Sequence, residues 1–173
     1  MISKDDFLAL SKRINYFPET GLLFWNENNY RTFKNKQIKN VCSSTGYGRI
    51  GYTNSNGKPC HLGAHQYVWM LYNGEIPDGF VIDHIDRNRT NNKVENLRLV
   101  TRSQNCCNAS HKKGSATGIK NVNWNKNRNT FQVSITCNGV HHYYGNFESL
   151  ADAVEVAKKA RLEIHGEYAL MED

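Results

Sequence analysis

Apolar residues in the N-terminal part of the chain form short runs separated by turn-forming residues, a pattern that predicts small helices and strands. Residues 3–15 have a near-helical apolar spacing behind Ser3, a potential N-cap, and residues 64–73 form an apolar run that ends at Gly74, a helix stop signal. The capping-box pattern of residues 101–104 predicts a short helix that runs through Asn108. Short strands are predicted at residues 22–25, 48–53, 58–63, 80–83 and 97–100.

The C-terminal part changes from a period of two to a helical period. Apolar and polar residues alternate over residues 130–136, which predicts a strand with one buried and one exposed face. Further strands are predicted from Val122 and over residues 141–147, and Asn138-Gly139 is a hairpin signal. The segment from Ser149 to Gly166 carries its apolar residues on one stripe, which predicts a helix packed on this sheet.

The charge pattern adds a class of partner to this picture. The chain of 173 residues has a formal net charge of +6. Two long stretches lack acidic residues altogether, one between Glu27 and Glu75 and one from Asn96 to Phe147, although both contain several lysines and arginines. A solvated surface normally mixes both signs, so these stretches favour two surfaces that lie against phosphates. Chance in an asparagine-rich chain is the alternative.

The cysteines and the hydropathy pattern bear on location. The chain has five cysteines, none in a Cys-x-x-Cys pair, so a structural zinc site of the usual spacing is not indicated. The odd number of cysteines and the lack of a signal-peptide pattern favour a reducing cytosol, and no apolar run approaches the length of a membrane span. We therefore expect a cytoplasmic protein.

The segment from Val81 to Asn108 has the richest chemistry. Asp83 and His84 end a predicted strand, and Asn105 lies in the helix that follows the next strand. His84 has the near-neutral pKa that a general base for water needs. The Asp83 carboxylate and the Asn105 amide carbonyl are hard oxygen ligands, which suit Mg²⁺ or Mn²⁺ better than Zn²⁺.

This segment closely resembles the HNH endonuclease family in its ββα-metal form. The family pattern is present as Asp83-His84, Asn96-Leu97-Arg98 and Asn105. The resemblance implies that His84 is the general base, that Asp83 and Asn105 hold a divalent metal ion, and that Asn96 ties the long loop and so orients His84. The third letter of the motif is asparagine here and not histidine, which argues against tightly held zinc. Asn108, one turn beyond Asn105, is a candidate for a supporting or phosphate contact.

The segment before this motif also resembles these nucleases. Residues 16–25 are similar to a leader that is frequent in phage HNH proteins, and His65 matches a histidine that often opens the helix before the site. Helix-start hydrogen bonding and a phosphate contact are both open to His65, and the structural role is favoured. Arg98 and Arg102 are candidate DNA-binding residues.

The C-terminal part resembles the APETALA-type DNA-binding domain, in which three antiparallel strands pack on one helix and the sheet lies in the major groove. The alternation places Phe131, Val133 and Ile135 toward the helix. An ordinary domain with a polar outer face is the alternative. Because few arginines stand at the reading positions, DNA binding is a firmer expectation than sequence specificity. The residues expected to face DNA are Lys120, Lys126, Arg128, Thr130, Gln132, Ser134 and Thr136.

These observations predict an α+β protein, with a ββα-metal nuclease core followed by a three-stranded antiparallel sheet on one helix. The expected domains are a leader that contacts DNA, the nuclease domain, a linker and the APETALA-type domain, at residues 1–46, 47–110, 111–117 and 118–173. The function predicted is that of a site-directed DNA endonuclease of the homing or mobile phage type. A regulator with a vestigial centre and a nonspecific nuclease are the alternatives.

The predicted partner is double-stranded DNA, cut inside a phage host cell by a monomer with one Mg²⁺ or Mn²⁺ ion. Neither a membrane nor a protein partner is implied by the sequence.

Overall fold

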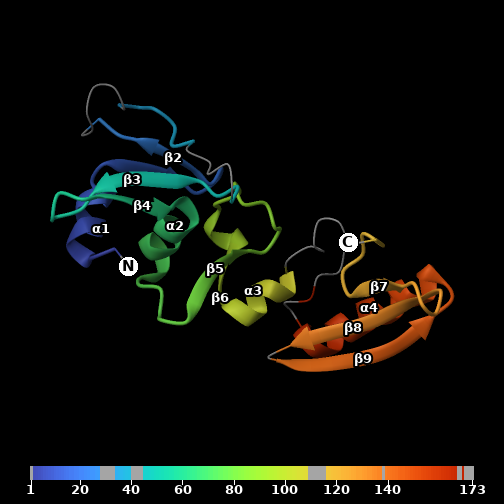
Figure 1. Cartoon of the computed structure of the whole chain (residues 1–173). Helices are drawn as coiled ribbons and strands as arrows, with labels where there is room; N and C mark the ends of the chain where they lie inside the picture. The colour runs from blue at the N-terminus through green and yellow to red at the C-terminus, as the bar shows by residue number, and fades with distance from the viewer. Residues whose placement is uncertain are drawn as a thin grey trace. The chain divides into compact units, whose positions relative to one another are not determined.

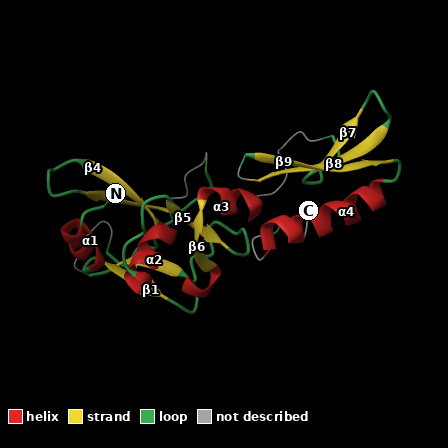
Figure 2. Ribbon diagram, turned by 90° about the horizontal axis from the view of Figure 1, so that it is seen from below, coloured by secondary structure: helices red, strands yellow, loops and turns green. Residues whose placement is uncertain are grey.

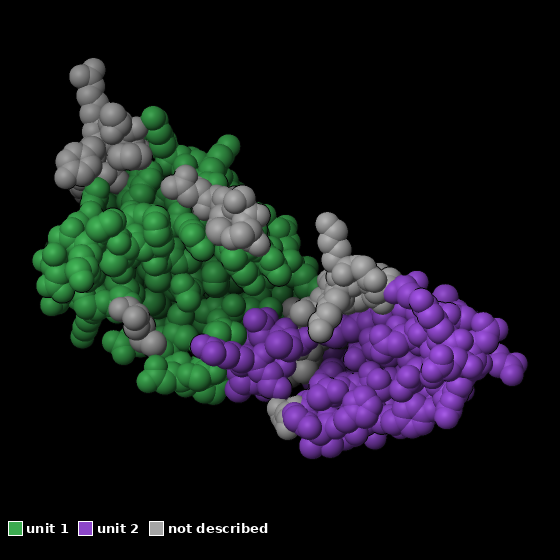
Figure 3. Space-filling view, viewed as in Figure 1, with its two compact units in different colours: residues 1–99 green, residues 100–173 purple. Residues whose placement is uncertain are grey.

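The computed structural model describes residues 2–27, 34–39, 45–108, 116–137, 139–166 and 169, without the side chains of Cys107 and Asn108. The chain divides into two compact units, residues 1–99 and residues 100–173 (Figure 3). Most of the expected linker at 111–117 lies outside the described residues, as does Asn138 of the hairpin turn. The expected domain boundaries stay a prediction.

The N-terminal unit opens with helix α1, Lys4–Ser11 (Figure 1). The Ser3 hydroxyl caps this helix by accepting a 3.1 Å hydrogen bond from the Asp6 backbone N–H. The helix was predicted to continue to residue 15, and that extent is wrong. Strand β1, Ile14–Phe17, pairs antiparallel with β2, Leu22–Trp25. The β-branched and aromatic side chains of β1 favour a strand, and the turn at Pro18–Gly21 joins it to β2.

The next elements agree closely with those predicted. Strands β3, Arg49–Thr53, and β4, Pro59–Gly63, form an antiparallel hairpin, and helix α2 covers Ala64–Asn73. Strand β5, Phe80–His84, pairs with β6, Leu97–Thr101, and the short 3-10 helix η1, Val94–Asn96, ends the loop between them. Helix α3, Arg102–Asn108, follows β6 directly.

A single core joins the leader of the N-terminal unit to its nuclease motif. Leu10, Ile14 and Leu23 from the leader belong to the same buried cluster as Tyr67 of α2 and Ile82 of β5. Burial of apolar side chains is the main stabilising term in a unit of this size, so the leader contributes to the stability of the segment that carries the motif.

The C-terminal unit contains strands β7, Val122–Asn125, β8, Thr130–Cys137, and β9, Val140–Phe147, in the sheet order β7-β8-β9. Helix α4, Leu150–His165, lies along one face of this sheet (Figure 2). Val133 is fully buried with Ala153 and Ala157 of the helix, so the predicted register is confirmed. Gln132 is only half-buried, at the adjacent position whose side chain points to the opposite face.

The predicted fold class, α+β with a ββα core and a three-stranded sheet packed on one helix, is therefore confirmed. In the part of the chain that the structure describes, no helix combines the length and the apolar character needed to span a membrane.

Candidate active site

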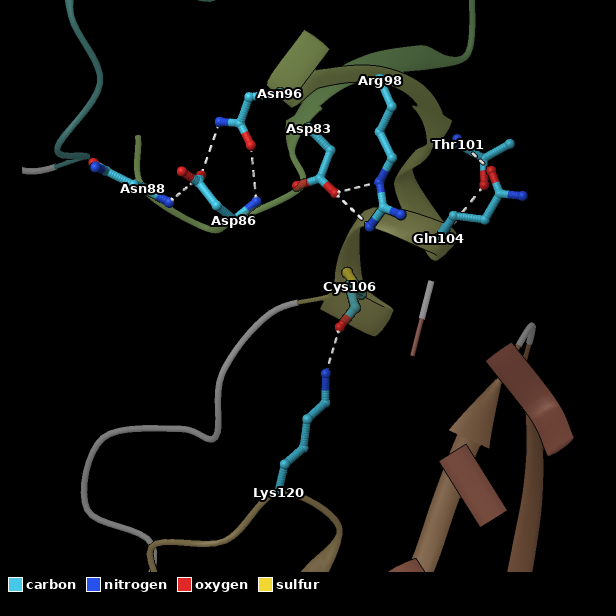
Figure 4. A network of polar contacts seen from close by, with 9 residues as sticks. All are labelled: Asp83, Asp86, Asn88, Asn96, Arg98, Thr101, Gln104, Cys106 and Lys120. Atoms are coloured by element: carbon cyan, nitrogen blue, oxygen red, sulfur yellow. Dashed lines mark hydrogen bonds and ion pairs between the residues drawn. The ribbon is translucent and has the colours of Figure 1, made fainter. Parts of the chain in front are cut away.

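Strand β5 carries Asp83 and His84 into the interior of the N-terminal unit. Asp83 is 7% exposed and His84 is 2% exposed. The Asp83 carboxylate accepts hydrogen bonds from Arg98 on β6, with distances to Oδ2 of 3.0 Å from Nε and 2.9 Å from Nη2 (Figure 4). Burial of an unpaired carboxylate costs free energy of folding. The ion pair with Arg98 balances the charge of Asp83 and orients its carboxylate.

The loop between β5 and β6 is held by a network of asparagine side chains around Asp86 (Figure 4). The Asn96 side chain donates to Asp86 Oδ1 at 2.8 Å and to the Asn91 carbonyl at 2.9 Å, and accepts from the Asp86 backbone N–H at 3.1 Å. Asn91 donates to Asp86 Oδ2 at 2.7 Å. Burial is the largest single influence on the pKa of Asp86 and raises it. The hydrogen bonds together outweigh this effect, so the pKa of Asp86 is lowered. Asn96 therefore closes the loop that starts at His84, which is the structural part of the role expected for it.

The His84 imidazole is held by Asn92, which lies in the same loop. The distance between His84 Nε2 and Asn92 Oδ1 is 3.1 Å. An amide oxygen only accepts hydrogen bonds, so this contact places the proton on Nε2 and leaves the lone pair on Nδ1. Burial lowers the pKa of His84, and the Asn92 hydrogen bond and the nearby Asp86 and Asp83 partly offset that effect. A lowered pKa keeps the ring neutral and able to take up a proton.

Two more rings pack against His84. His65, in the first turn of α2, has its ring centroid 5.3 Å from that of His84, and the Tyr47 ring lies 4.8 Å from His65 and 5.7 Å from His84. Burial, and secondarily the neighbouring His84, lowers the pKa of His65 to about 3. Gly63 makes room for this ring, because a Cβ atom at Gly63 would lie 2.8 Å from His65 Cε1. His65 is therefore a buried neighbour of His84.

Arg89 lies over the Tyr47 ring. Its guanidinium carbon lies 4.9 Å from the centroid of the Tyr47 ring, and its Nη1 donates to the Thr45 carbonyl at 2.6 Å. A cation over an aromatic face is attracted by the ring quadrupole. Arg89 thus links the loop after His84 to residues 45–47, a connection that no periodic pattern in the sequence predicts.

The leader hairpin supports the same loop from another side. The Tyr16 hydroxyl donates to the Asn92 carbonyl at 3.0 Å and accepts from the Val94 backbone N–H at 3.2 Å. Gly21 has a φ of +69°, and a Cβ atom there would lie 2.7 Å from the Lys93 backbone nitrogen. The turn between β1 and β2 therefore requires a glycine at position 21 for two reasons. The backbone has a positive φ there, and it lies too close to the loop between β5 and β6 to leave room for a side chain.

Comparison with known proteins identifies the family. A family model described as HNH endonuclease matches residues 62–106, which include Asp83, His84, Asn96 and Asn105. Protein 3.8 of Escherichia phage T7 is 37% identical over 107 residues, which are 61% of this chain and 86% of that protein. The chain belongs to the HNH endonuclease family.

Other relatives of this HNH endonuclease are more distant. An uncharacterized HNH endonuclease of Acanthamoeba polyphaga mimivirus is 30% identical over 106 residues, which are 61% of this chain and 54% of that protein, so the chain spans about half of its length. A solved structure described as "DNA binding and cleavage by the HNH homing endonuclease I-HmuI" is similar at 23% identity and a TM-score of 0.44. That similarity covers 87% of this chain and 76% of the solved one.

The remaining predicted nuclease residues of this HNH endonuclease lie on and after β6. Arg98 is engaged with Asp83, and Arg102 is exposed at the start of α3. The predicted capping box is confirmed, since the Thr101 backbone N–H donates to Gln104 Oε1 at 2.8 Å and the Gln104 N–H to Thr101 Oγ1 at 3.2 Å (Figure 4). Asn105 is half-buried on α3, in the C-terminal unit. That Asn105 and Asp83 bind the same metal ion stays a prediction. The Asn108 side chain lies outside the described part of the chain.

The predicted DNA-facing residues of the C-terminal unit differ in their exposure to solvent. Lys126, Arg128 and Thr136 are exposed, and the half-buried members are Thr130, Gln132 and Ser134. Lys120 donates from Nζ to the Cys106 carbonyl of α3 at 2.8 Å (Figure 4). A contact of these residues with DNA stays a prediction.

Proposed function

We propose that this HNH endonuclease is a site-directed DNA endonuclease of the homing or mobile phage type, with His84 as the general base. The observation that carries the proposal is the buried, neutral imidazole at the end of β5, next to the buried Asp83 carboxylate and held at Nε2 by Asn92. A positioned imidazole whose pKa lies near or below neutral pH is suited to take a proton from water.

In the proposed reaction, a water oxygen attacks the phosphorus of a DNA phosphodiester while His84 Nδ1 accepts the proton that this water loses. The bond between phosphorus and the leaving sugar oxygen breaks, and that oxygen takes up a proton from solvent. His84 then returns its proton to solvent, so the protein is unchanged and the DNA carries one phosphate end and one hydroxyl end. Asn92 and the Asn96 network hold the imidazole through this step.

The family implies a divalent metal ion, and the donors at this site fit one that prefers oxygen. Asp83 and Asn105 are the residues that would hold it. Among the residues that the structure describes, no three or more His, Cys, Asp or Glu side chains gather as a metal site. With two protein ligands proposed, water and the DNA phosphate would complete the shell. Such a ligand set suits Mg²⁺ or Mn²⁺ better than Zn²⁺. The bound ion would neutralise charge that develops on the phosphate and on the leaving oxygen.

The C-terminal unit is proposed to bind the DNA that the nuclease centre cuts. The turn between β7 and β8 contains exposed Lys126 and Arg128, and the strands β7, β8 and β9 have no acidic residue. The acidic residues of this unit that the structure describes lie after β9, from Glu148 onward. This separation of charge favours DNA on the sheet face, as in the APETALA-type domains that the unit resembles.

The partner proposed is double-stranded DNA inside a phage host cell, bound by a monomer. One nuclease centre per chain is expected to cut one strand in each binding event.

The deciding experiment compares His84→Ala with wild type on duplex DNA from the flanks of the gene's own insertion site, with Mg²⁺ or Mn²⁺. Cleavage should fall by roughly a hundredfold to ten-thousandfold, while DNA affinity stays within a factor of a few, because the base acts on water. His61→Ala, which changes an exposed histidine on β4, is the matched control and should cleave like wild type.

Three results would contradict the proposal. Near-wild-type cleavage by His84→Ala would exclude His84 as the base. A wild-type protein that binds DNA without cutting it would favour a regulator with a vestigial centre. A smear in place of discrete fragments would favour a nonspecific nuclease.

A further inference from the structure

Three carboxamide side chains lie in a row across the C-terminal sheet. The strand register pairs Asn123 of β7 with Gln132 of β8, and Gln132 with Asn146 of β9. Neighbouring strands are about 4.8 Å apart, so the row spans roughly 10 Å. The adjacent positions Val122 and Val133 are fully buried in the core with the helix, so the amide row is on the opposite face.

Two members of the row, Gln132 and Asn146, line a hollow of about 520 Å³ on this face. The hollow has no acidic residue in its lining, which consists of Asn125, Asn127, Arg128, Gln132, Tyr143 and Asn146. Buried polar atoms are normally hydrogen-bonded. Two side-chain oxygens on these strands, Asn146 Oδ1 and Thr130 Oγ1, are buried without a hydrogen-bond partner among the described residues.

A carboxamide presents one acceptor and two donors in a plane. This arrangement matches the major-groove edge of adenine, which offers the N7 acceptor and the N6 amino donor, whereas guanine is matched by arginine or lysine and cytosine by carboxylates. The hollow has four carboxamides, one arginine and no carboxylate. The Tyr143 ring, 54% exposed at the position opposite Ser134, offers an apolar surface of the kind that contacts the thymine methyl group.

We propose that the Asn123–Gln132–Asn146 row reads adenine in the major groove and that the C-terminal unit therefore selects A·T pairs. A span of roughly 10 Å corresponds to about three base-pair steps, because bases along one strand are 3.4 Å apart. Arg128 lies at the turn that borders the hollow and contacts phosphate. This inference rests on the proposed function in one respect, the binding of duplex DNA by this unit.

The test measures binding of the full chain by fluorescence anisotropy in EDTA, which prevents metal-dependent cleavage. Its probes are an alternating A·T duplex, a G·C duplex of the same length, and the A·T duplex with 7-deazaadenine in place of adenine. The last probe removes only the N7 acceptor and needs no change to the protein. Wild type should bind the A·T duplex roughly tenfold more tightly than the G·C duplex, and 7-deazaadenine should abolish most of that difference.

Two variants and a control complete the test. Gln132→Ala and Asn146→Ala should each lower the A·T preference by roughly threefold or more and leave the melting temperature near that of wild type. Lys158→Ala, at an exposed position of α4, is the control and should keep the preference.

The outcomes separate this inference from the proposed function. Tight binding with equal affinity for all three duplexes would overturn adenine reading, and the unit would remain a DNA-binding module that contacts only the backbone. A preference that persists with 7-deazaadenine and in both variants would also overturn it, because the selectivity would then come from elsewhere in the protein. Absence of binding to any duplex would overturn the proposed function itself.

Discussion

His65 is packed against the ring of His84, and its pKa is lowered to about 3, mainly because burial disfavours the imidazolium form. Between pH 3 and the ordinary value of 6.5, the unfolded chain binds a proton at this residue and the folded chain does not. The free energy of unfolding should therefore fall as the pH decreases through this window, by on the order of 5 kcal/mol in total.

Urea unfolding of the full chain at a series of pH values checks this prediction. The unfolding is monitored by the fluorescence of the tyrosine and tryptophan residues of the N-terminal unit. His65→Gln should flatten the loss of stability below pH 6.5, because the glutamine amide does not titrate in this range. His61→Gln, at an exposed position of β4, should leave the pH dependence as in wild type. Equal slopes in the two variants would show that His65 does not carry the effect.

Asp83 supplies the only charged ligand that we propose for the metal ion. Asp83→Ala should abolish cleavage in both Mg²⁺ and Mn²⁺, and Asp83→Asn should do the same while it keeps an oxygen that can accept from Arg98. Asn105→Ala should be milder and partly rescued by a high metal concentration, because a neutral ligand contributes less.

Cleavage rates measured against metal concentration distinguish these cases. If Asn105→Ala leaves the metal dependence untouched, the metal site lies elsewhere. Substantial cleavage by Asp83→Asn would remove the need for an anionic ligand at this position.

The β1–β2 hairpin holds the catalytic loop through one hydroxyl. Tyr16→Phe removes the hydrogen bonds of that hydroxyl with the Asn92 carbonyl and the Val94 N–H. Both backbone groups then lose this hydrogen-bond partner. We expect a loss of about 1–2 kcal/mol in the free energy of unfolding and slower cleavage at nearly unchanged DNA affinity, because Asn92 also holds His84.

Thermal melting, cleavage and binding measured on the same preparation test this expectation. Tyr72→Phe, which alters a tyrosine that is 51% exposed near the end of α2, is the control. Loss of stability with a wild-type cleavage rate would show that the hairpin supports the fold without orienting the site.

Much of the element structure could be predicted from local pattern. The alternation in β8 fixed which residues meet the helix, and the Thr101–Gln104 box located the start of α3, because both signals depend on neighbours a few residues apart. The strand β1 was missed because helical spacing over residues 3–15 did not reveal that Ile14 pairs with Trp25.

The candidate site could be predicted in part. The motif identified Asp83, His84 and Asn96, and the structure places Asp83 and His84 on β5 and Asn96 on η1. Asn92, Tyr16 and Tyr47 were missed, since their importance lies in contacts that only the folded chain creates, such as the 76-residue separation between Tyr16 and Asn92. An asparagine in a polar loop reads first as a turn former.

The two compact units predict a division of labour in the whole molecule. A chain that ends at residue 114 retains α3 and lacks the C-terminal sheet. It should lose affinity and specificity more than the rate of chemistry on bound DNA. Each phosphate contact that is lost should flatten the log–log dependence of affinity on salt by roughly 0.9.

Salt titrations of binding by the full and shortened chains, with cleavage measured at saturating protein, separate affinity from chemistry. A salt slope identical in the two chains would show that the C-terminal sheet does not touch DNA.

The close fit of Gly21 against the backbone of Lys93 also bears on how such a nuclease can be exchanged between genes. The family match begins at residue 62, yet the turn that fits this loop lies some forty residues earlier in the chain. A recombination breakpoint between them would join the motif to a foreign leader whose turn has to reproduce both the glycine and the tyrosine hydroxyl. The segment that must be inherited together is therefore longer than the matched family segment, residues 62–106. Functional chimaeras should have their upstream junction before β1.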